Sequence, residues 1–422
     1  MSDNFIKLRQ RIFDRVKRSI TADADEVGLK RRTKVLPVCT SNFFKYLSSL
    51  FLVCLLLSLS GCNPPQRVSA EERMFRNLSL EFLDSYEIPQ DKFKDTVVGG
   101  LSAIAYNKEL DRFYVLSDDR SKLSAARFYT FDLDVEQQND RIKIQSFEPE
   151  EVTFIKNERD ENYSPGKIDP EGLAISPRNT VFISSEGNTT ENIEPFIGEF
   201  ELATGKKISN IRLPQRFLTN EDSDLTQGVQ ENLAFESLTI NRVGLPEDPF
   251  RLFTATESSL IQDKSRDSQE RSRIRFLHYS INSVGDPILV AEHLYLLDPA
   301  PIEVISNGLT ELFALQTEGY FLSLERTFGF DGAGAKIFQV VVGDATDTSN
   351  IKSLKGDLGQ VRTLKKQLLL NLQDLNIYLD NLEGMTIGPR LPDGSRSLLL
   401  ISDDNFNSEQ ISQLLLFRLI EN

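Results

Sequence analysis

Short runs of alternating apolar and polar residues recur along the chain in pairs, and a turn joins the two runs of each pair. In residues 169–188, Leu173 and Ile175 alternate with small residues in the first run, and residues 181–183 form the apolar part of the second. Alternation with a period of two on both sides of a turn predicts an antiparallel hairpin. Four further stretches fit the same pattern: 101–119, 235–257, 309–326 and 382–404. This repetition predicts an architecture built from one repeated supersecondary unit.

Two more apolar runs follow the hairpin in four of the five units, so each unit is predicted to be a four-stranded antiparallel meander. The fifth unit ends with its third strand at residues 413–420, and a strand at residues 78–89 precedes the first unit without a partner. A ring of meanders closes well when one blade takes strands from both chain ends. We therefore expect an all-β fold, a β-propeller whose last blade is closed by the N-terminal strand. Five blades are counted, and residues 139–168 or 343–372 leave room for a sixth.

The N-terminal region differs from the repeats and carries a long apolar run between residues 43 and 62. The run is typical of a signal-peptide core, and its last residues, Leu59-Ser60-Gly61-Cys62, match the lipobox of bacterial lipoproteins, in which the cysteine is lipidated. The alternative is an uncleaved anchor helix, although the run is short of the roughly 20 residues that such a helix needs. About forty residues of charged sequence precede the run, which indicates either a start codon placed too early or a cytoplasmic tail.

These features divide the chain into three parts. We predict a basic region with a lipoprotein signal peptide over residues 1–61, a lipidated Cys62 with a tether over residues 62–77, and the propeller over residues 78–422. The alternative for the tether is a first helix packed on the propeller. Both interpretations of the apolar run place the propeller outside the cytoplasm, anchored to a bacterial membrane. We expect the protein to be a monomer.

Charge and cysteine content narrow the classes of function. The net charge is −15, and residues 1–61 contain 11 basic and 5 acidic residues, so the propeller itself is more acidic than the whole chain. A body this acidic repels a phosphate backbone, which disfavours nucleic acid as a partner and favours cations. The three cysteines are Cys39, Cys54 and Cys62, so the exported body has neither a disulfide nor a thiol catalyst.

Carboxylates recur at both ends of the predicted hairpins. The start of the first strand and the end of the second lie at one edge of a hairpin, so these acids are expected on one face of the propeller. Strand starts would ring the mouth of the central channel: Glu171, Glu236, Glu311 and Glu383, with Ser102 at the fifth place. Strand ends would form a wider ring: Asp118, Asp119, Glu186, Glu257, Glu325, Asp403 and Asp404.

So many carboxylates in one place cannot all stay ionised without compensation, and a bound hard cation would supply it. Ligands that offer only oxygen favour Ca²⁺ or Mg²⁺ over zinc. The alternative is structural: the first-strand glutamates would accept backbone N–H groups at strand starts. Three arginines, Arg120, Arg127 and Arg326, are expected near the same edge, where they would either bind a substrate oxyanion or neutralise the acids.

Other catalytic chemistries lack their motifs. The sequence has no Gly-x-Ser-x-Gly nucleophile elbow, no phosphate-binding glycine loop before a helix, and no Cys/His metal cluster. Its two histidines, His278 and His293, fall inside predicted strands, where a structural role is the usual one.

Several motifs together resemble a known family. They are GGLSAIAY with RFYVLSDDRS, DPEGLAI with SSEGN, ENLAFESLTI with TATE, NGLTELFAL with LER, and LDNLEGM with LLLISDDNF. The sequence is similar, from about residue 80 to its end, to the bacterial family named for esterase-like activity of phytase. The resemblance implies a secreted or lipid-anchored propeller related to calcium-dependent phytases, which hydrolyse phosphomonoesters at a metal cluster on one face. Ala103, Ala105 and Ser237 depart from the family motifs, but none of these departures removes a candidate ligand.

Two functions are compatible with these residues and motifs. In the first, the acidic face holds Ca²⁺, a water molecule is the nucleophile, and Arg120 and Arg326 bind the oxyanion of a small phosphate or other ester. In the second, the protein is a non-catalytic lipoprotein whose propeller binds a ligand or an envelope protein. Lys or Arg clustered beside the acids would favour the first, and only Arg120, Arg127, Lys264, Arg266 and Arg326 are available.

Overall fold

The computed structural model describes residues 74–139, 141–219, 226–241, 245–265, 270–299, 304–330 and 332–421. Regular structure in these ranges is almost entirely β-strand, with a few 3₁₀ turns. None of the helices in the described ranges has the length and apolar character needed to cross a membrane. Cys62, the apolar run and most of the tether lie outside the described residues.

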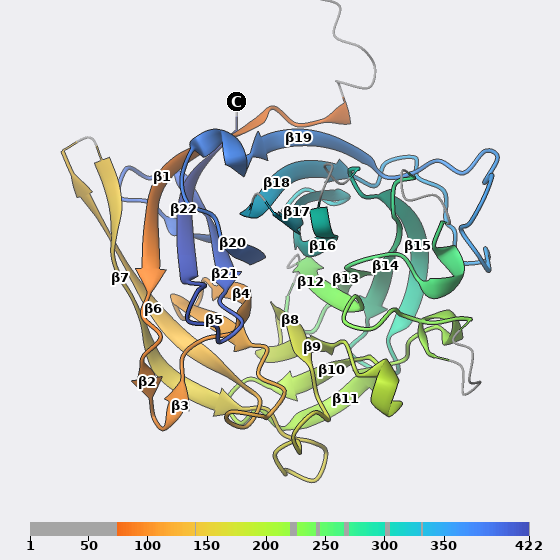
Figure 1. Cartoon of the computed structure of the whole chain (residues 1–422), viewed down its shortest axis with the longest axis horizontal. Helices are drawn as coiled ribbons and strands as arrows, with labels where there is room; N and C mark the ends of the chain where they lie inside the picture. The colour runs from red at the N-terminus through yellow and green to blue at the C-terminus, as the bar shows by residue number, and fades with distance from the viewer. Residues whose placement is uncertain are drawn as a thin grey trace, which may run out of the picture. The chain divides into compact units, whose positions relative to one another are not determined.

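The strands form five four-stranded antiparallel sheets, which are the blades of a propeller (Figure 1). Blade 1 consists of β4 (Leu101–Asn107), β5 (Arg112–Ser117), β6 (Arg127–Gln138) and β7 (Arg141–Phe154). Blade 2 consists of β8 (Pro170–Ile175), β9 (Thr180–Ser185), β10 (Phe196–Glu201) and β11 (Lys207–Ile211). Blade 3 consists of β12 (Phe235–Asn241), β13 (Phe250–Thr256), β14 (Arg273–Ile281) and β15 (Ile288–Leu296). Blade 4 consists of β16 (Val304–Ala314), β17 (Tyr320–Gly329), β18 (Gly332–Val341) and β19 (Lys365–Asn371).

Blade 5 takes its strands from both ends of the described chain. It consists of β20 (Asn381–Arg390), β21 (Arg396–Asp403), β22 (Ser412–Glu421) and β1 (Leu78–Ile88). β1 pairs antiparallel with β22 over its whole length, from Leu78 opposite Glu421 to Ile88 opposite Ser412. The predicted closure by an N-terminal strand is therefore confirmed.

The count of five blades is also confirmed within the described ranges. Residues 141–154 belong to β7 of blade 1, and residues 365–371 form β19 of blade 4, so neither candidate region forms a sixth blade. Two short strands, β2 (Lys92–Phe93) and β3 (Thr96–Val97), make a small hairpin before blade 1. The 3₁₀ turns are η2 (Thr189–Glu191), η3 (Gln215–Phe217), η4 (Ile261–Asp263) and η5 (Leu372–Leu375).

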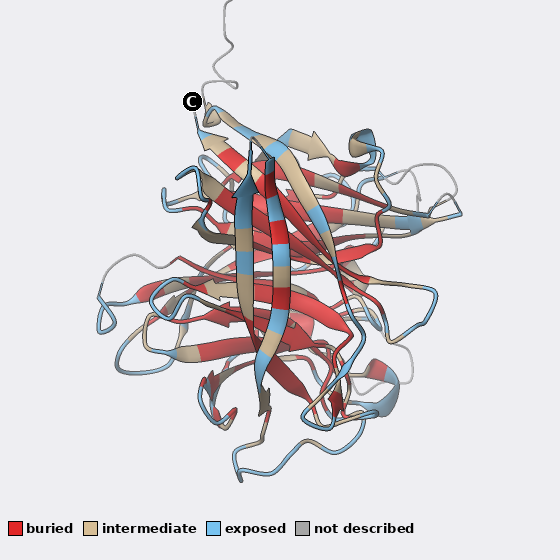
Figure 2. Ribbon diagram, turned by 90° about the vertical axis from the view of Figure 1, so that its left-hand side faces the viewer, coloured by how far each residue is buried: buried red, intermediate tan, exposed pale blue. Residues whose placement is uncertain are grey.

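The hydrophobic core consists of five clusters, one between each pair of neighbouring blades. In β5, Phe113 and Val115 pack toward blade 5, whereas Tyr114 and Leu116 pack toward blade 2. Successive side chains of a strand point to opposite faces, so a strand buried on both faces is a continuous apolar run, as β5 is. Burying each such side chain contributes about 1.5–3 kcal/mol. Buried residues accordingly follow the inner strands, and exposed residues lie in the connecting loops and along outer strands such as β1 and β7 (Figure 2).

The first strand of each blade lies nearest the centre of the ring, as predicted (Figure 1). β4, β8, β12, β16 and β20 contact one another in circular order. The starts of these strands therefore meet at one end of the central channel, and their ends meet at the other. These two ends hold the two cavities described below.

Candidate metal centre at the acidic face

A β-bulge near the start of each inner strand determines which side chains turn toward the channel mouth. The pairing of β4 with β5 shifts between Leu101 and Ala103, and the other four inner strands show an equivalent irregularity. A bulge adds one residue to a strand and re-aims its side chain. The residues at this place are Ser102, Glu171, Glu236, Thr310 and Glu383.

The wider ring follows from the same register. The residue before each bulge pairs with Ser117, Ser185, Thr256, Glu325 or Ser402. The next residue along each second strand forms the wider ring: Asp118, Glu186, Glu257, Arg326 and Asp403. Four of its five members are acids, and blade 4 contributes an arginine instead.

These two rings surround a cavity of about 390 Å³, which we call the acidic cleft. Its walls are Asp118, Arg120, Glu171, Asn232, Glu236, Ser306, Arg326, Phe328, Asn381, Glu383, Asn405, Asp403 and Gln410. Five of these residues are acids that the sequence predicts at this face. The lining thus brings together carboxylates from four different blades.

Three carboxylates of blade 2 form a compact group, and one of them, Glu171, lines the cleft. Asp169, Glu171 and Glu186 each offer one oxygen, and these oxygens all lie within 4.8 Å of one another. This group, which we call the triad, could hold a metal ion, and an all-oxygen donor set is the kind that Ca²⁺ and Mg²⁺ prefer. Asp169 also lies 2.6 Å from Nε of Arg120, so one of its oxygens is already charge-compensated.

Buried polar atoms around the triad lack partners in the described structure. They are Ser102 Oγ, Asp118 Oδ1, Glu236 Oε2 and Arg326 Nε. A buried polar atom without a partner costs about 1–3 kcal/mol, so native proteins rarely leave several of them together. Their concentration at one cleft fits a site that receives a cation, water or a polar ligand.

Burial and mutual repulsion raise the carboxyl pKa values of the acidic cleft. Burial is the largest cause in each case. It raises the pKa of Asp118, Glu171, Glu186 and Glu236 well above the ordinary range, and neighbouring carboxylates raise it further. It raises the pKa of Asp169 to about 6, of Asp403 to about 7 and of Glu383 to about 8. Protons or a cation are therefore needed to balance the negative charge at neutral pH.

Arg326 is the internal counter-ion of the cleft. Its Nη2 lies 2.8 Å from Oε1 of Glu257 in blade 3, and its Nη1 lies 3.1 Å from Oε1 of Glu383 in blade 5. Burial opposes the charge of Arg326, but Glu257, Glu383 and Glu236 outweigh it and raise the pKa of the guanidinium. Arg326 thus ties three blades together at the ring position where the other blades have acids.

Arg120 and Arg127 differ in how they meet the acids. Arg120 lines the cleft, is paired with Asp169 and donates to Asn232. Arg127 is fully buried, and its Nη1 lies 2.8 Å from Oδ2 of Asp119. Arg127 is therefore an ion-pair partner inside blade 1, which is the structural alternative that the sequence left open for it.

Comparison with known proteins agrees with this architecture. A family model described as Phytase-like, esterase-like activity of phytase, matches residues 96–406. The chain belongs to this family. No curated protein sequence matches it.

Solved structures similar to this phytase-like chain are distant. The catalytic domain of the Coprinopsis cinerea GH62 α-L-arabinofuranosidase is 10% identical, with a TM-score of 0.36 over 82% of this chain and 98% of that one. The Bombyx mori GH32 β-fructofuranosidase is 10% identical, with a TM-score of 0.34 over 89% of this chain and 66% of that one. Likeness at this level indicates nothing about the activity of the phytase-like chain.

Four acids predicted at this face lie elsewhere in the phytase-like propeller. Asp119 accepts backbone N–H groups of Lys122, Leu123 and Ser124 and pairs with Arg127. Asp404 accepts the backbone N–H of Gly100 at 2.8 Å and so joins blade 5 to blade 1. Asp118 and Asp403, which directly precede these two residues in the sequence, line the cleft. Asp119 and Asp404 instead stabilise a loop and a blade junction.

The other two lie in blade 4 and are displaced by one position. Glu325 is buried and accepts from Tyr295, from Lys366 and from the backbone N–H of Asp298. Glu311 lies one residue past the bulge, and its Oε1 accepts the backbone N–H groups of Leu312 at 2.8 Å and Leu238 at 3.2 Å. A shift of one residue turns a strand side chain to the other face, so Glu311 does not join the ring as the sequence predicts.

The contacts of the glutamates separate the two interpretations of the first-strand acids. Glu311 accepts backbone N–H groups, as a structural cap would. Glu383 instead accepts from the side chains of Arg326 and Asn381, and Oε2 of Glu236 has no partner in the described structure. The glutamates at the ring thus face the acidic cleft, whereas Glu311 is held by backbone N–H groups outside it.

Asp169 and Asn381 are site residues that the sequence prediction did not include. Each lies two residues before a ring glutamate, directly before or at the start of its inner strand. Asn381 Nδ2 lies 2.8 Å from Oε1 of Glu383, which orients that carboxylate. Two other blades have Gly100 and Gly308 here, where an added Cβ would lie 2.0 Å from a carboxylate oxygen of the wider ring. The signal in the sequence was a polar residue at a position where two other blades have glycine.

Proposed function

We propose that this phytase-like propeller hydrolyses an ester bond of a small molecule, a phosphomonoester or a carboxylic ester, with a divalent cation bound at the acidic cleft. The observation that carries the proposal is the triad of Asp169, Glu171 and Glu186, whose oxygens converge within 4.8 Å beside a cleft-lining arginine. Family membership supports the choice of ester chemistry.

The triad would hold Ca²⁺, or Mg²⁺ in its place, because all of its donors are carboxylate oxygens. When bound, the cation would polarise an ester oxygen and lower the pKa of a bound water molecule. Asp118 and Glu236 border the same cleft with unpartnered oxygens, so they extend the donor set or accept hydrogen bonds from water.

The two arginines would have different tasks. Arg120 is oriented by Asp169 and Asn232, and its side chain retains 27% exposure, so it is able to meet the oxyanion of a substrate. Arg326 has 12% exposure and is engaged by Glu257 and Glu383. Its task in the proposal is to hold these carboxylates in place.

We also propose that the protein acts outside the cytoplasm, tethered through lipidated Cys62 to a bacterial membrane. The lipobox-like residues 59–62 and the preceding apolar run support this placement. The acidic body supports a small-molecule substrate and disfavours nucleic acid. A monomer suffices for the proposal, because one chain supplies all residues of the cleft.

The test uses the exported body, residues 63–422, with p-nitrophenyl phosphate and p-nitrophenyl acetate as substrates. The proposal expects hydrolysis of at least one, its loss with EDTA, and its return with Ca²⁺ or Mg²⁺. Glu171→Gln should lose activity and Asp393→Asn, on an exposed turn, should keep it. Metal-independent activity, or none with either substrate, contradicts the proposal; the latter favours a propeller that binds without catalysis.

A further inference from the structure

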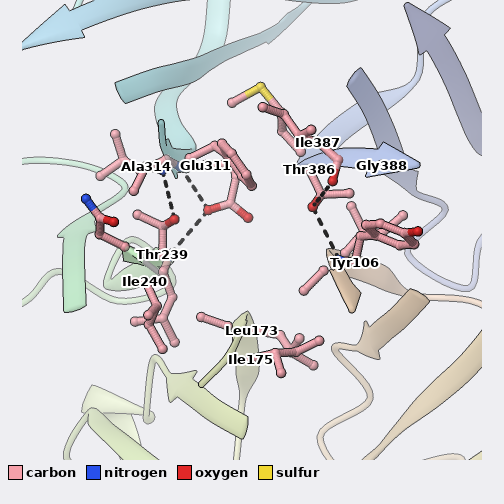
Figure 3. Close-up of a pocket in the computed structure, with 18 of the residues that line it drawn as sticks. Tyr106, Leu173, Ile175, Thr239, Ile240, Glu311, Ala314, Thr386, Ile387 and Gly388 are labelled. Atoms are coloured by element: carbon pink, nitrogen blue, oxygen red, sulfur yellow. Dashed lines mark hydrogen bonds between the residues drawn. The ribbon is translucent and has the colours of Figure 1, made fainter. Parts of the chain in front are cut away.

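A second cavity lies at the opposite end of the inner strands from the acidic cleft. Its volume is about 410 Å³, and all five inner strands contribute to its walls. Most of the residues that line it are apolar, among them Ile104, Leu312 and Met385. Figure 3 labels three others, Leu173, Ile175 and Ile240. We call this cavity the funnel. It shares no lining residue with the acidic cleft, so the proposed hydrolysis does not use it.

The inner strands approach closely between the two cavities. At the strand position just past the bulge, blades 1, 2, 3 and 5 have small residues: Ala103, Gly172, Ser237 and Gly384. A Cβ on Gly172 would lie 2.3 Å from the carbonyl oxygen of Glu236, so there is no room for a side chain there. Blade 4 alone places a large residue at this level, Glu311, which is only 3% exposed.

The carboxyl group of Glu311 forms the polar end of the funnel. Its Oε1 accepts the backbone N–H groups of Leu312 and Leu238, and the backbone N–H of Met385 is a third donor to the carboxyl group. Figure 3 shows the second oxygen on the side of the open middle of the cavity. The threonine hydroxyls nearby are already engaged: Thr239 accepts the backbone N–H of Ala314 at 2.9 Å, and Thr386 accepts that of Tyr106 at 3.3 Å. Lys108, Glu109, Asn241, Gln316 and Arg396 also line the funnel, but they lie at or beyond strand ends. Between the inner strands, the Glu311 carboxyl group is the charged group that a ligand would meet.

Apolar walls with a few placed polar groups, in a volume of about 300–1,000 Å³, are typical of small-molecule sites. A buried carboxyl group is stabilised by a donor and destabilised by a second carboxylate. We propose that the funnel binds a small, largely apolar molecule that presents a hydrogen-bond donor, a protonated amine or a hydroxyl, to Glu311. Apolar molecules of the same size that carry a carboxylate are disfavoured, because a second buried carboxylate either faces the like charge of Glu311 or loses its hydration beside a neutral Glu311.

Three probes of equal chain length test this proposal on the exported body: octylamine, octanol and octanoate, measured by titration calorimetry at neutral pH. Octylamine or octanol should bind at one site, and octanoate should bind at least about tenfold more weakly. An amine that binds more tightly than the alcohol indicates an ionised Glu311, and the reverse indicates a neutral one. Octanoate binding as tightly as the other two, or no binding of any probe up to its solubility limit, overturns the proposal.

Variants locate the binding. Ala314 lines the funnel, so Ala314→Leu adds volume to its wall and should abolish binding of both donor probes. Glu311→Gln should weaken octylamine more than octanol, because glutamine keeps an acceptor oxygen but not the charge. Glu171→Gln in the acidic cleft is the matched control and should bind the probes as the parent does. Unchanged binding by Ala314→Leu overturns the proposal even if Glu311→Gln does not fold.

Discussion

Raising the pH should destabilise the metal-free propeller, because carboxyl groups of the acidic cleft hold protons in the folded state that the unfolded chain releases. Burial raises the pKa of Asp403 to about 7 and of Glu383 to about 8, whereas both groups return to ordinary values on unfolding. A raised carboxyl pKa leaves stability unaffected at a pH below the unfolded value, where both states hold the proton. Stability then falls as the pH rises from the unfolded value to the folded value.

The size of the effect follows from Asp403. The ordinary pKa of an aspartate side chain is 3.8, and burial raises the pKa of Asp403 to about 7 in the folded chain. Between about pH 5 and pH 7, Asp403 alone holds one more proton in the folded than in the unfolded chain, so its contribution lowers the free energy of unfolding by about 1.4 kcal/mol per pH unit, or about 2.7 kcal/mol over this range. Glu383 shares the same field, so we count one proton for the pair. With an unfolding entropy of about 2.1 cal/mol/K per residue over about 350 residues, the melting temperature falls by about 4 °C.

The assay is a set of thermal melts of residues 63–422 in EDTA at about pH 5, 6, 7 and 8. The double variant Asp403→Asn/Glu383→Gln removes two of the titrating groups and should reduce the pH dependence, whereas the other buried carboxyl groups of the cleft keep the rest. Asp393→Asn, an exposed acid that pairs with Arg418, is the control and should keep it. A parent that melts at the same or a higher temperature at pH 8 than at pH 5 would refute the reasoning, as would a double variant with the parent's slope.

Three further predictions concern packing, closure and anchoring. Gly308→Ala would place a Cβ 2.0 Å from Oε1 of Glu257 and displace it from Arg326, so thermal melts should show a loss of about 1–3 kcal/mol; an unchanged melt contradicts this. Deleting residues 78–88 leaves β22 as an open edge and should cause aggregation and a lower melting temperature in size-exclusion and melting experiments, whereas a cooperative melt at the parent temperature speaks against closure by β1. Cys62→Ser should block lipidation and accumulate precursor, and membrane fractionation like that of the parent would disprove the anchor.

The fold was readable from the sequence because a propeller repeats one simple pattern. Each blade carries the same alternation, turn and acidic ends, so five weak signals reinforce one another. The unpaired strand near the N-terminus and the missing strand of the last unit together indicated the closure that β1 and β22 form. Local pattern and global architecture agree here, which is the condition under which such inference works.

The site could be predicted only in part, because the sequence does not show where a bulge shifts the pairing register of an inner strand. In blade 4 the segment 309–312, Leu-Thr-Glu-Leu, resembles the other strand starts, and for this reason the sequence predicts its glutamate, Glu311, in the ring. The bulge lies between Leu309 and Glu311, so Thr310 takes the ring place and Glu311 turns into the channel. The same shift of one residue exchanges Glu325 for Arg326 in the wider ring. Alternation cannot reveal where an extra residue is inserted.

The central claim, a cation at the triad, is tested most directly by titrating the metal-free body with Ca²⁺ in a calorimeter. We predict that the parent binds Ca²⁺ at one or more sites and that the double variant Glu171→Gln/Glu186→Gln lacks the site at the triad. The variant Glu311→Gln should bind Ca²⁺ as the parent does, because Glu311 lies outside the acidic cleft. A parent that binds neither Ca²⁺ nor Mg²⁺ across the millimolar range, or a double variant that binds as the parent does, would contradict the claim.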